Sequence, residues 1–95
     1  MDVDNIERVA RKFRLVCHPE RYKMIQLLEE KGKLNVTQIY EAMKMKQPEA
    51  SHHLTLMLDY EILKKVREGK CSVYSNNTEV LNKIIKYSEE LGKKG

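Results

Sequence analysis

Residues 35–74 read NVTQIYEAMKMKQPEASHHLTLMLDYEILKKVREGKCSVY, and the patterns in this stretch predict the fold. A short helix is expected first, because Asn35 is a suitable N-cap and Gln38 completes a variant of the capping box. A second helix should begin with Gln47-Pro48-Glu49, since a proline in the first helical turn loses no hydrogen bond. Its apolar residues recur with the spacing of one buried helix face: Ala50, Leu54, Met57 and Leu58. Two short helices joined by three residues predict a helix-turn-helix over residues 35–60, whose second helix is shaped to enter a DNA major groove.

A hairpin with a basic tip is expected directly after these helices. Two strand-like segments within residues 62–75 flank Glu68-Gly69-Lys70. Residues 64–70 carry four basic side chains against Glu68, a net charge of 4 − 1 = +3. A basic hairpin after a helix-turn-helix is a wing, and the combination predicts a DNA-binding protein. The alternative for any such charged run is an ordinary solvated surface, and that interpretation is favoured for a second basic cluster within residues 8–14.

In these segments the chain resembles the ArsR/SmtB family of winged helix-turn-helix repressors. Residues 19–28 are similar to the family's "DPTRLRILELL", residues 47–54 to "SQSAVSQHL" and residues 67–74 to "RREGRxxYY". The matches lie in register, in the family's order and without a gap from His18 to Tyr74. The resemblance implies a mainly α fold with a small β-hairpin, a winged helix-turn-helix of order α-α-α-α-β-β-α.

The chain departs from the family at positions that matter for sensing. Members that sense metal ahead of the recognition helix carry two cysteines in "ELCVCDL", and Asn35 and Thr37 occupy those positions here. A second family metal site uses a histidine on the last helix, and residues 78–91 contain none. We therefore expect neither a metal site nor a cofactor. Two usual family glycines are replaced by Lys44 and Glu61, each of which costs about 1 kcal/mol if it keeps a left-handed backbone.

The candidate DNA contacts come from the turn, the second helix and the wing. His52 points nearly opposite the apolar face, and the resemblance places base contacts at Gln47, Ser51 and His52, whose side chains can bond to base edges. Thr55 flanks this face where the family often has lysine. His53 matches a family histidine and is expected to brace the helix against a neighbour. The full predicted set is Lys46, Gln47, Ser51, His52, Thr55, Arg67 and Lys70.

Apolar stripes at both ends of the chain suggest an assembly. Residues 1–17 and 77–92 are expected to form helices, the last one capped by Asn76 with Glu79 three residues on and stopped by Gly92. In the resembling family the first and last helices form a two-fold dimer interface. Packing of both stripes on their own subunit is the alternative, but we favour a homodimer. The expected interface residues are Ile6, Val9, Phe13, Leu81, Ile84 and Ile85.

Composition agrees with one small domain spanning residues 1–95. The chain is 41% hydrophobic and 34% charged, with a net charge of +4 and a pI near 9.1, which favours a polyanionic partner only weakly. No apolar run approaches the ~18 residues of a membrane span, and the N-terminus lacks an export signal. With only two cysteines, we expect a cytoplasmic protein without a membrane partner.

Cys17, His18 and Cys71 are the remaining residues with possible site chemistry. Packing cysteines are favoured over a redox pair or a metal site, and His18 is expected to cap or end a helix. There is no glycine-rich phosphate loop, carboxylate pair or activated nucleophile, so an enzyme is not expected. The favoured function is a dimeric repressor that binds an inverted-repeat DNA operator. The alternative is a winged-helix protein-interaction module that does not read DNA.

Overall fold

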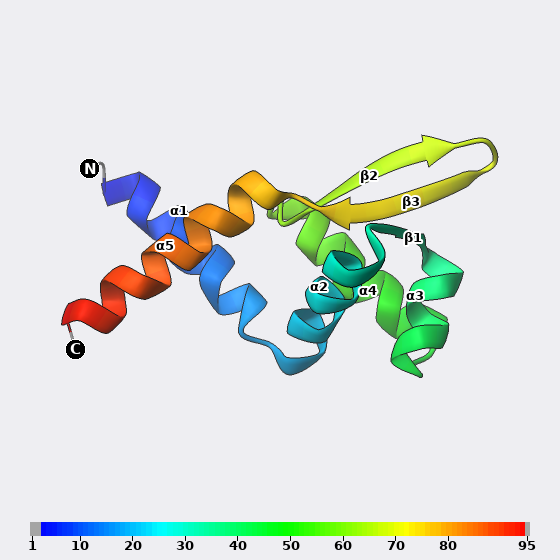
Figure 1. Ribbon diagram of the computed structural model, residues 1–95, viewed down its shortest axis with the longest axis horizontal. Helices are drawn as coiled ribbons and strands as arrows, with labels where there is room; N and C mark the ends of the chain where they lie inside the picture. Colours follow the sequence, from blue (N-terminus) through cyan, green and yellow to red (C-terminus); the bar gives the residue numbers. More distant parts are fainter. Residues whose placement is uncertain (1–2, 95) are drawn as a thin grey trace.

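The computed structural model describes the backbone of residues 3–94 and the side chains of residues 6–90. These residues form a winged helix-turn-helix in which α1 and α5 pack together at one end and a β-hairpin extends at the other (Figure 1). In chain order the elements are α1 (Val3–Val16), α2 (Pro19–Lys31), β1 (Lys33–Asn35), α3 (Val36–Met43), α4 (Gln47–Asp59), β2 (Leu63–Glu68), β3 (Cys71–Asn76) and α5 (Thr78–Lys94).

The helix-turn-helix forms as its local signals predict. The Asn35 side chain accepts from the Gln38 N–H at 2.9 Å, and the Gln38 side chain accepts from the Asn35 N–H at 2.9 Å. This reciprocal capping box satisfies two donors that a helix start would otherwise leave without partners. The second helix of the pair, α4, begins at Gln47 with Pro48 in its first turn, as expected.

The sheet has three strands in the order β1-β3-β2, not the two that the sequence pattern predicted. The additional strand β1 pairs antiparallel with β3, with Leu34 opposite Tyr74. A strand of three residues is too short to show the alternation of apolar and polar side chains by which strands are predicted from sequence. This strand exists because the chain between α2 and α3 passes along the free edge of β3.

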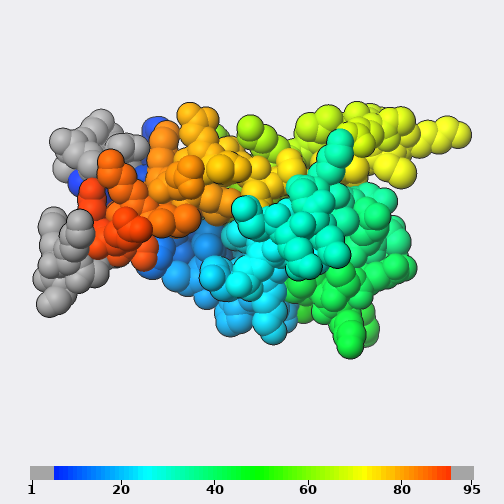
Figure 2. All heavy atoms as spheres, viewed as in Figure 1, coloured from blue at the N-terminus to red at the C-terminus, as the bar shows by residue number. Residues whose placement is uncertain are grey.

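The wing hairpin is confirmed: β2 lies one residue later than expected, while β3 begins at Cys71 as expected and ends one residue later. β2 and β3 pair from Leu63–Asn76 to Glu68–Cys71, which leaves Gly69 and Lys70 as a two-residue tip. Gly69 has a φ of +60°, a left-handed conformation that suits glycine in a tight hairpin turn. In β2 only the first residue is buried, whereas five of the six residues of β3 are half-buried, so β3 rests on the body while β2 and the hairpin tip are exposed. The tip extends beyond the rest of the molecule (Figures 1 and 2).

The last helix differs from its predicted ends. Its N-cap is Asn77, whose side chain accepts from the Val80 N–H at 3.4 Å, while Asn76 closes β3 and donates to the Ile25 carbonyl at 2.9 Å. Either of two adjacent asparagines satisfies the sequence preference for an N-cap. The position at which β3 ends determines which of them caps the helix. The helix also runs through Gly92 to Lys94, because a glycine weakens a helix without ending it. Leu91, expected on the apolar side, lies outside the described side chains.

The core lies where α2, α3, α4 and the base of the hairpin meet. Three of the four residues predicted to face it from α4 are at most 1% exposed, and Leu58 packs at its edge. Within residues 3–94, none of the helices combines the length and the apolar character that crossing a bilayer requires. The buried apolar residues are Met24, Leu28, Ile39, Ala50, Leu54, Met57, Ile62, Leu63, Val80 and Ile84.

Candidate nucleic-acid interface

Helix α4 divides into a buried inner face and an exposed outer face. Gln47, His52 and Thr55 are exposed on the outer face, whereas Ser51 is half-buried at its edge. The helix sequence contains Glu49 and Asp59 but no lysine or arginine. The outer-face residues Gln47, His52 and Thr55 therefore offer hydrogen-bonding groups that suit base edges, while attraction of phosphates is left to other elements.

The turn before α4 supplies two of those cations. Lys44 ends α3 in a left-handed conformation, with φ 56° and ψ 43°, and its N–H donates to the Glu41 carbonyl at 3.2 Å. Glu61, after α4, is also left-handed with a φ of 62°. Both sites therefore keep the backbone that the resembling glycines would have. Lys46, predicted as a DNA contact, is exposed at the N-cap of α4.

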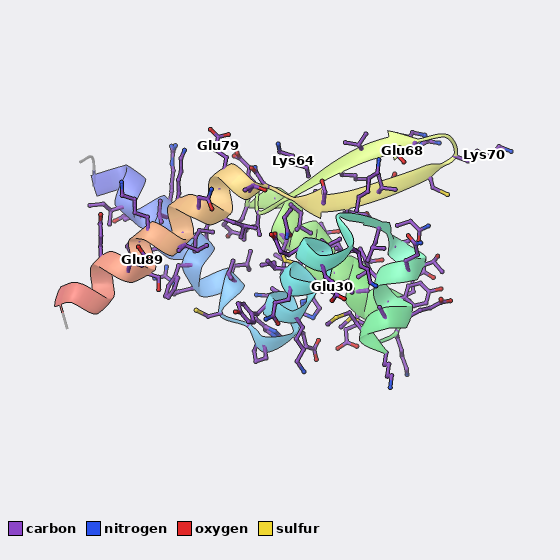
Figure 3. The ribbon with its side chains drawn as sticks, viewed as in Figure 1. Glu30, Lys64, Glu68, Lys70, Glu79 and Glu89 are labelled. Atoms are coloured by element: carbon purple, nitrogen blue, oxygen red, sulfur yellow. The ribbon has the colours of Figure 1, made fainter. Side chains whose placement is uncertain are left out.

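The wing supplies the other cations. The predicted contacts Arg67 and Lys70 are exposed, and Figure 3 shows Lys70 extending from the hairpin tip. Glu68 forms an ion pair with Lys33 of β1, and the Lys65 ammonium lies 5.9 Å from the centre of the Tyr74 ring. The negative charge of Glu68 is thus paired with Lys33, which lies outside the hairpin, so the basic side chains of the hairpin remain available.

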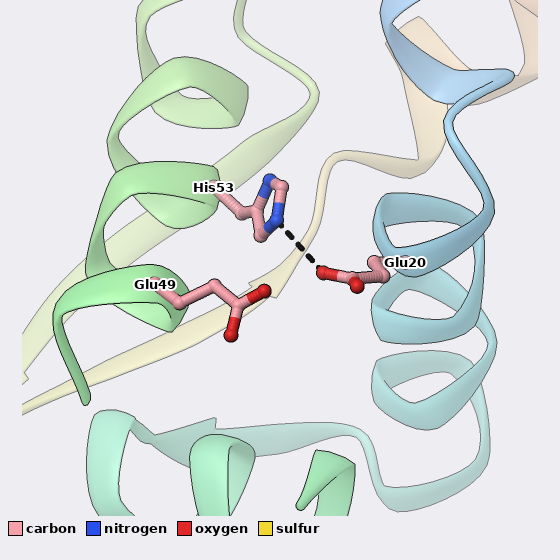
Figure 4. A group of neighbouring side chains, drawn as sticks. All are labelled: Glu20, Glu49 and His53. Carbon is pink, nitrogen blue, oxygen red and sulfur yellow. Dashed lines mark hydrogen bonds and ion pairs between the residues drawn. The ribbon is translucent and has the colours of Figure 1, made fainter. Parts of the chain in front are cut away.

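His53 braces α4 against α2, as predicted (Figure 4). His53 is only 6% exposed, and its Nε2 lies 3.0 Å from a carboxylate oxygen of Glu20. On the other side of the ring, Arg21 Nε donates to His53 Nδ1 at 3.2 Å. His18 caps α2, because its Nδ1 accepts from the Glu20 N–H at 3.2 Å. Both histidines therefore stabilise the start of α2, His18 as its cap and His53 through its contact with Glu20.

Three possible metal ligands gather at this brace. Atoms of Glu20, Glu49 and His53 lie within 4.8 Å of one another. An arginine N–H can only donate, so His53 Nδ1 must carry the lone pair and Nε2 the hydrogen. Metal-binding histidines show the opposite pattern, in which one nitrogen binds the metal and the other donates. The arrangement fits a hydrogen-bonded brace and does not fit a metal centre as it stands.

The two cysteines are free and exposed, so their interpretation as packing residues was wrong. Cys17 follows the last turn of α1, and Cys71 is the first residue after the hairpin tip. The end of α1 and the start of β3 lie in different parts of the molecule (Figure 1).

The end helices leave apolar surface uncovered. Phe13 of α1 meets Tyr87 of α5 edge to face, with ring centres 5.7 Å apart. Ile6 is 40% and Ile85 is 54% exposed, whereas Ile84 is 4% exposed and fills the chain's own core. Little of Ile84 therefore remains for a partner. The other predicted interface residues, Val9, Phe13 and Leu81, are half-buried.

A hollow of ≈ 550 Å³ runs between α2 and α5 beside this surface, and its lining includes Tyr22, Ile25, Leu81 and Ile85. A second hollow, of ≈ 460 Å³, continues past Tyr22 and Ile85 to Phe13. The two share residues, so they form one mainly apolar groove along α5.

The family model described as "Bacterial regulatory protein, arsR family" matches residues 18–65, from the cap of α2 into β2. The chain belongs to this family. An uncharacterized HTH-type transcriptional regulator of Methanocaldococcus jannaschii is 32% identical over 94% of this chain and 100% of its own length. The transcriptional repressor PagR of Bacillus anthracis is 35% identical over 86% of this chain and 82% of its own.

Solved structures of ArsR-type proteins share the fold. The crystal structure of PagR superimposes with a TM-score of 0.77 at 34% identity, covering 87% of this chain and 95% of that one. A homodimeric winged helix-turn-helix DNA-binding domain from Mycobacterium bovis gives a TM-score of 0.76 at 21% identity, covering 95% and 83%. The ArsR family and these relatives are transcriptional regulators, so this chain is a DNA-binding regulator and not an enzyme.

Sequence patterns missed three residues of this region. Lys33 balances Glu68 across two strands, and Glu20 and Arg21 hold His53 across two helices. Arg21 lay inside a segment that matched the family's second helix, which marked the residue without revealing its role. Lys33 carried no such signal.

Proposed function

We propose that this ArsR-family regulator is a dimeric repressor that binds an inverted-repeat operator through α4 and the wing. The observation that carries the proposal is the division of α4, whose inner face is buried while Gln47, His52 and Thr55 face solvent. Gln47 would pair with a base, His52 and Ser51 would bond to neighbouring base edges, and Thr55 would flank them. Half-sites would repeat about 34 Å apart, one turn of the duplex.

Phosphate contacts would come from the basic groups on either side of α4. Lys46 lies at the start of the helix, while Arg67 and Lys70 lie on the projecting hairpin. Exposed charges near the tip of a hairpin gain from phosphate proximity but read little sequence. The wing would therefore supply affinity, and α4 would supply the sequence preference.

The second subunit would bind along α1 and α5. In support, Ile6 and Ile85 are about half exposed, and the apolar groove beside α5 has no cover within the described residues. The related Mycobacterium bovis domain is homodimeric. An apolar groove flanked by exposed isoleucines is a surface that a second copy of the chain could cover.

Selection of bound duplexes from random DNA tests the proposal directly. The expected result is enrichment of an inverted repeat whose two halves lie one helical turn apart. Absence of enrichment, with the protein folded, would contradict operator binding and favour the protein-interaction module.

We also propose that metal ions do not release this repressor from DNA, because the family's two usual metal sites lack ligands here. Asn35 and Thr37 stand at the thiolate positions, and α5 has no histidine in its sequence. Zinc, cadmium, copper(I) or arsenite, added at concentrations near the protein's own, should leave operator binding unchanged. A metal that binds stoichiometrically and weakens operator affinity about tenfold, a coupling of about 1.4 kcal/mol, would contradict this.

A further inference from the structure

The Arg21 side chain connects its own helix, α2, to two others, α1 and α4. It belongs to the first turns of α2, and its Nε donates to His53 of α4 at 3.2 Å. Its Nη1 donates to the carbonyl of Leu15 at 3.3 Å. Leu15 lies in the last turn of α1, where helix carbonyls lack partners within the helix and the dipole favours a cation. The guanidinium therefore connects the end of α1 to the buried face of α4.

The chemistry at each end of this connection is specific. His53 must present a lone pair at Nδ1 to accept from Arg21, and its Nε2 then donates to Glu20. The ring is thus fixed in one neutral tautomer and one orientation. Because His53 is 6% exposed, water cannot readily replace either partner. The adjacent residue, His52, is exposed on the outer face, so the angle of α4 about His53 sets where that face points.

We propose that Arg21 is a positioning residue that couples the dimer helix α1 to the recognition helix α4. The inference rests on the proposed function, in which α1 lies in the dimer interface and α4 reads DNA. Since a planar guanidinium holds both acceptors in a fixed geometry, the orientation of α4 follows the end of α1. The distance between the two recognition helices of a dimer is then set partly through this contact.

The first test is Arg21→Lys, which keeps the charge but replaces the fork with a single ammonium that cannot reproduce both contacts. Affinities are measured for duplexes whose half-sites are separated by the optimal spacing, and by one base pair more or less. The wild type should show a sharp optimum. The variant should lose about tenfold on the optimal operator and show a flattened spacing profile, with unchanged dimer mass and unchanged affinity for random DNA.

Two substitutions of His53 form a matched pair that separates positioning from general stability. His53→Asn keeps an acceptor near the position of Nδ1 and loses the contact with Glu20. His53→Gln keeps a donor near the position of Nε2 and loses the acceptor for Arg21. Both put an amide in the same buried site, so their melting temperatures should fall similarly. Only His53→Gln should flatten the spacing profile as Arg21→Lys does.

The outcomes are distinct. Equal spacing profiles for the two His53 variants, or a sharp optimum retained by Arg21→Lys, would overturn the coupling while leaving the repressor proposal intact. A wild-type protein that prefers no operator would overturn the proposed function and the coupling with it.

Discussion

The helix-turn-helix and the pair of end helices bury their apolar residues to different extents. In α3 and α4, Ile39, Ala50 and Met57 are 0% exposed, so this unit completes its core within one chain. On α1 and α5, Ile6 is 40% and Ile85 is 54% exposed. Under the proposed function the difference separates two tasks. Each chain folds its own DNA-binding helix-turn-helix, whereas the relative position of two such units depends on dimerisation through α1 and α5.

The largest effect should come from a charge on the uncovered face. Ile85→Asp places a carboxylate where the proposed partner would exclude water, but the exposed position tolerates it in one chain. The sedimentation mass should fall from about twice 11.2 kDa to 11.2 kDa. Operator affinity should fall on the order of 100-fold or more, because two linked half-sites become independent.

Lys86→Asp is the matched control, one residue on and turned about 100° around the helix. It should leave the mass unchanged. A wild type that sediments as a single chain at micromolar concentration would show that the exposed face has another use.

A smaller and more selective loss is expected on α4. Gln47→Ala should cost about 1–3 kcal/mol on the operator and little on random DNA, with relaxed preference at one base pair in each half-site. Competition titrations on operator and scrambled duplexes measure the difference. Parallel losses on both duplexes would remove Gln47 from the set of base-reading residues.

Wing charges should act without regard to sequence. Arg67→Ala should weaken binding to all duplexes about equally and lower the salt slope by roughly one unit, the signature of one lost phosphate contact. Titrations at several salt concentrations measure this slope. Arg11→Ala removes the same charge from an exposed site on α1 and should leave the slope unchanged. A loss confined to the operator would instead assign Arg67 to base reading.

The smallest effect concerns the turn that sets the angle between α3 and α4. Lys44 has a φ of 56°, so Lys44→Gly should raise the free energy of unfolding by about 0.5–1 kcal/mol, the strain relieved less the added freedom of the unfolded chain. Lys23→Gly, at an exposed site inside α2, should lower it by about 1 kcal/mol. Urea denaturation distinguishes the two, and equal destabilisation by both would mean that the Lys44 side chain stabilises the turn in its own right.

Local signals predicted the helix-turn-helix and the wing because each depends on residues a few positions apart. The Asn35–Gln38 capping box and the spacing of Ala50, Leu54 and Met57 are of this kind. The missed features depend on distant partners. β1 requires the edge of β3, and Arg21 requires α1 and α4, which no local pattern contains. The choice of Asn77 over Asn76 as a cap depended on where β3 ends.

Burial was predicted less well at the end helices than in α4. An apolar stripe indicates which residues avoid water. It does not indicate whether they are buried by the same chain or by a partner. Ile84 and Ile85 are adjacent and equally apolar, yet the first is 4% and the second 54% exposed. Only the three-dimensional packing of α5 determines which residues of the stripe lie in the core and which at the surface.

The exposed thiol of Cys71 gives direct experimental access to the wing. The chain's second cysteine, Cys17, is also exposed, so Cys17→Ser leaves one reactive sulfur, beside the hairpin tip. A nitroxide label attached there in each copy would let pulsed electron paramagnetic resonance measure the separation of two wings. Spectra taken with and without a bound duplex would then report how far the hairpins move, in a chain altered at a single position.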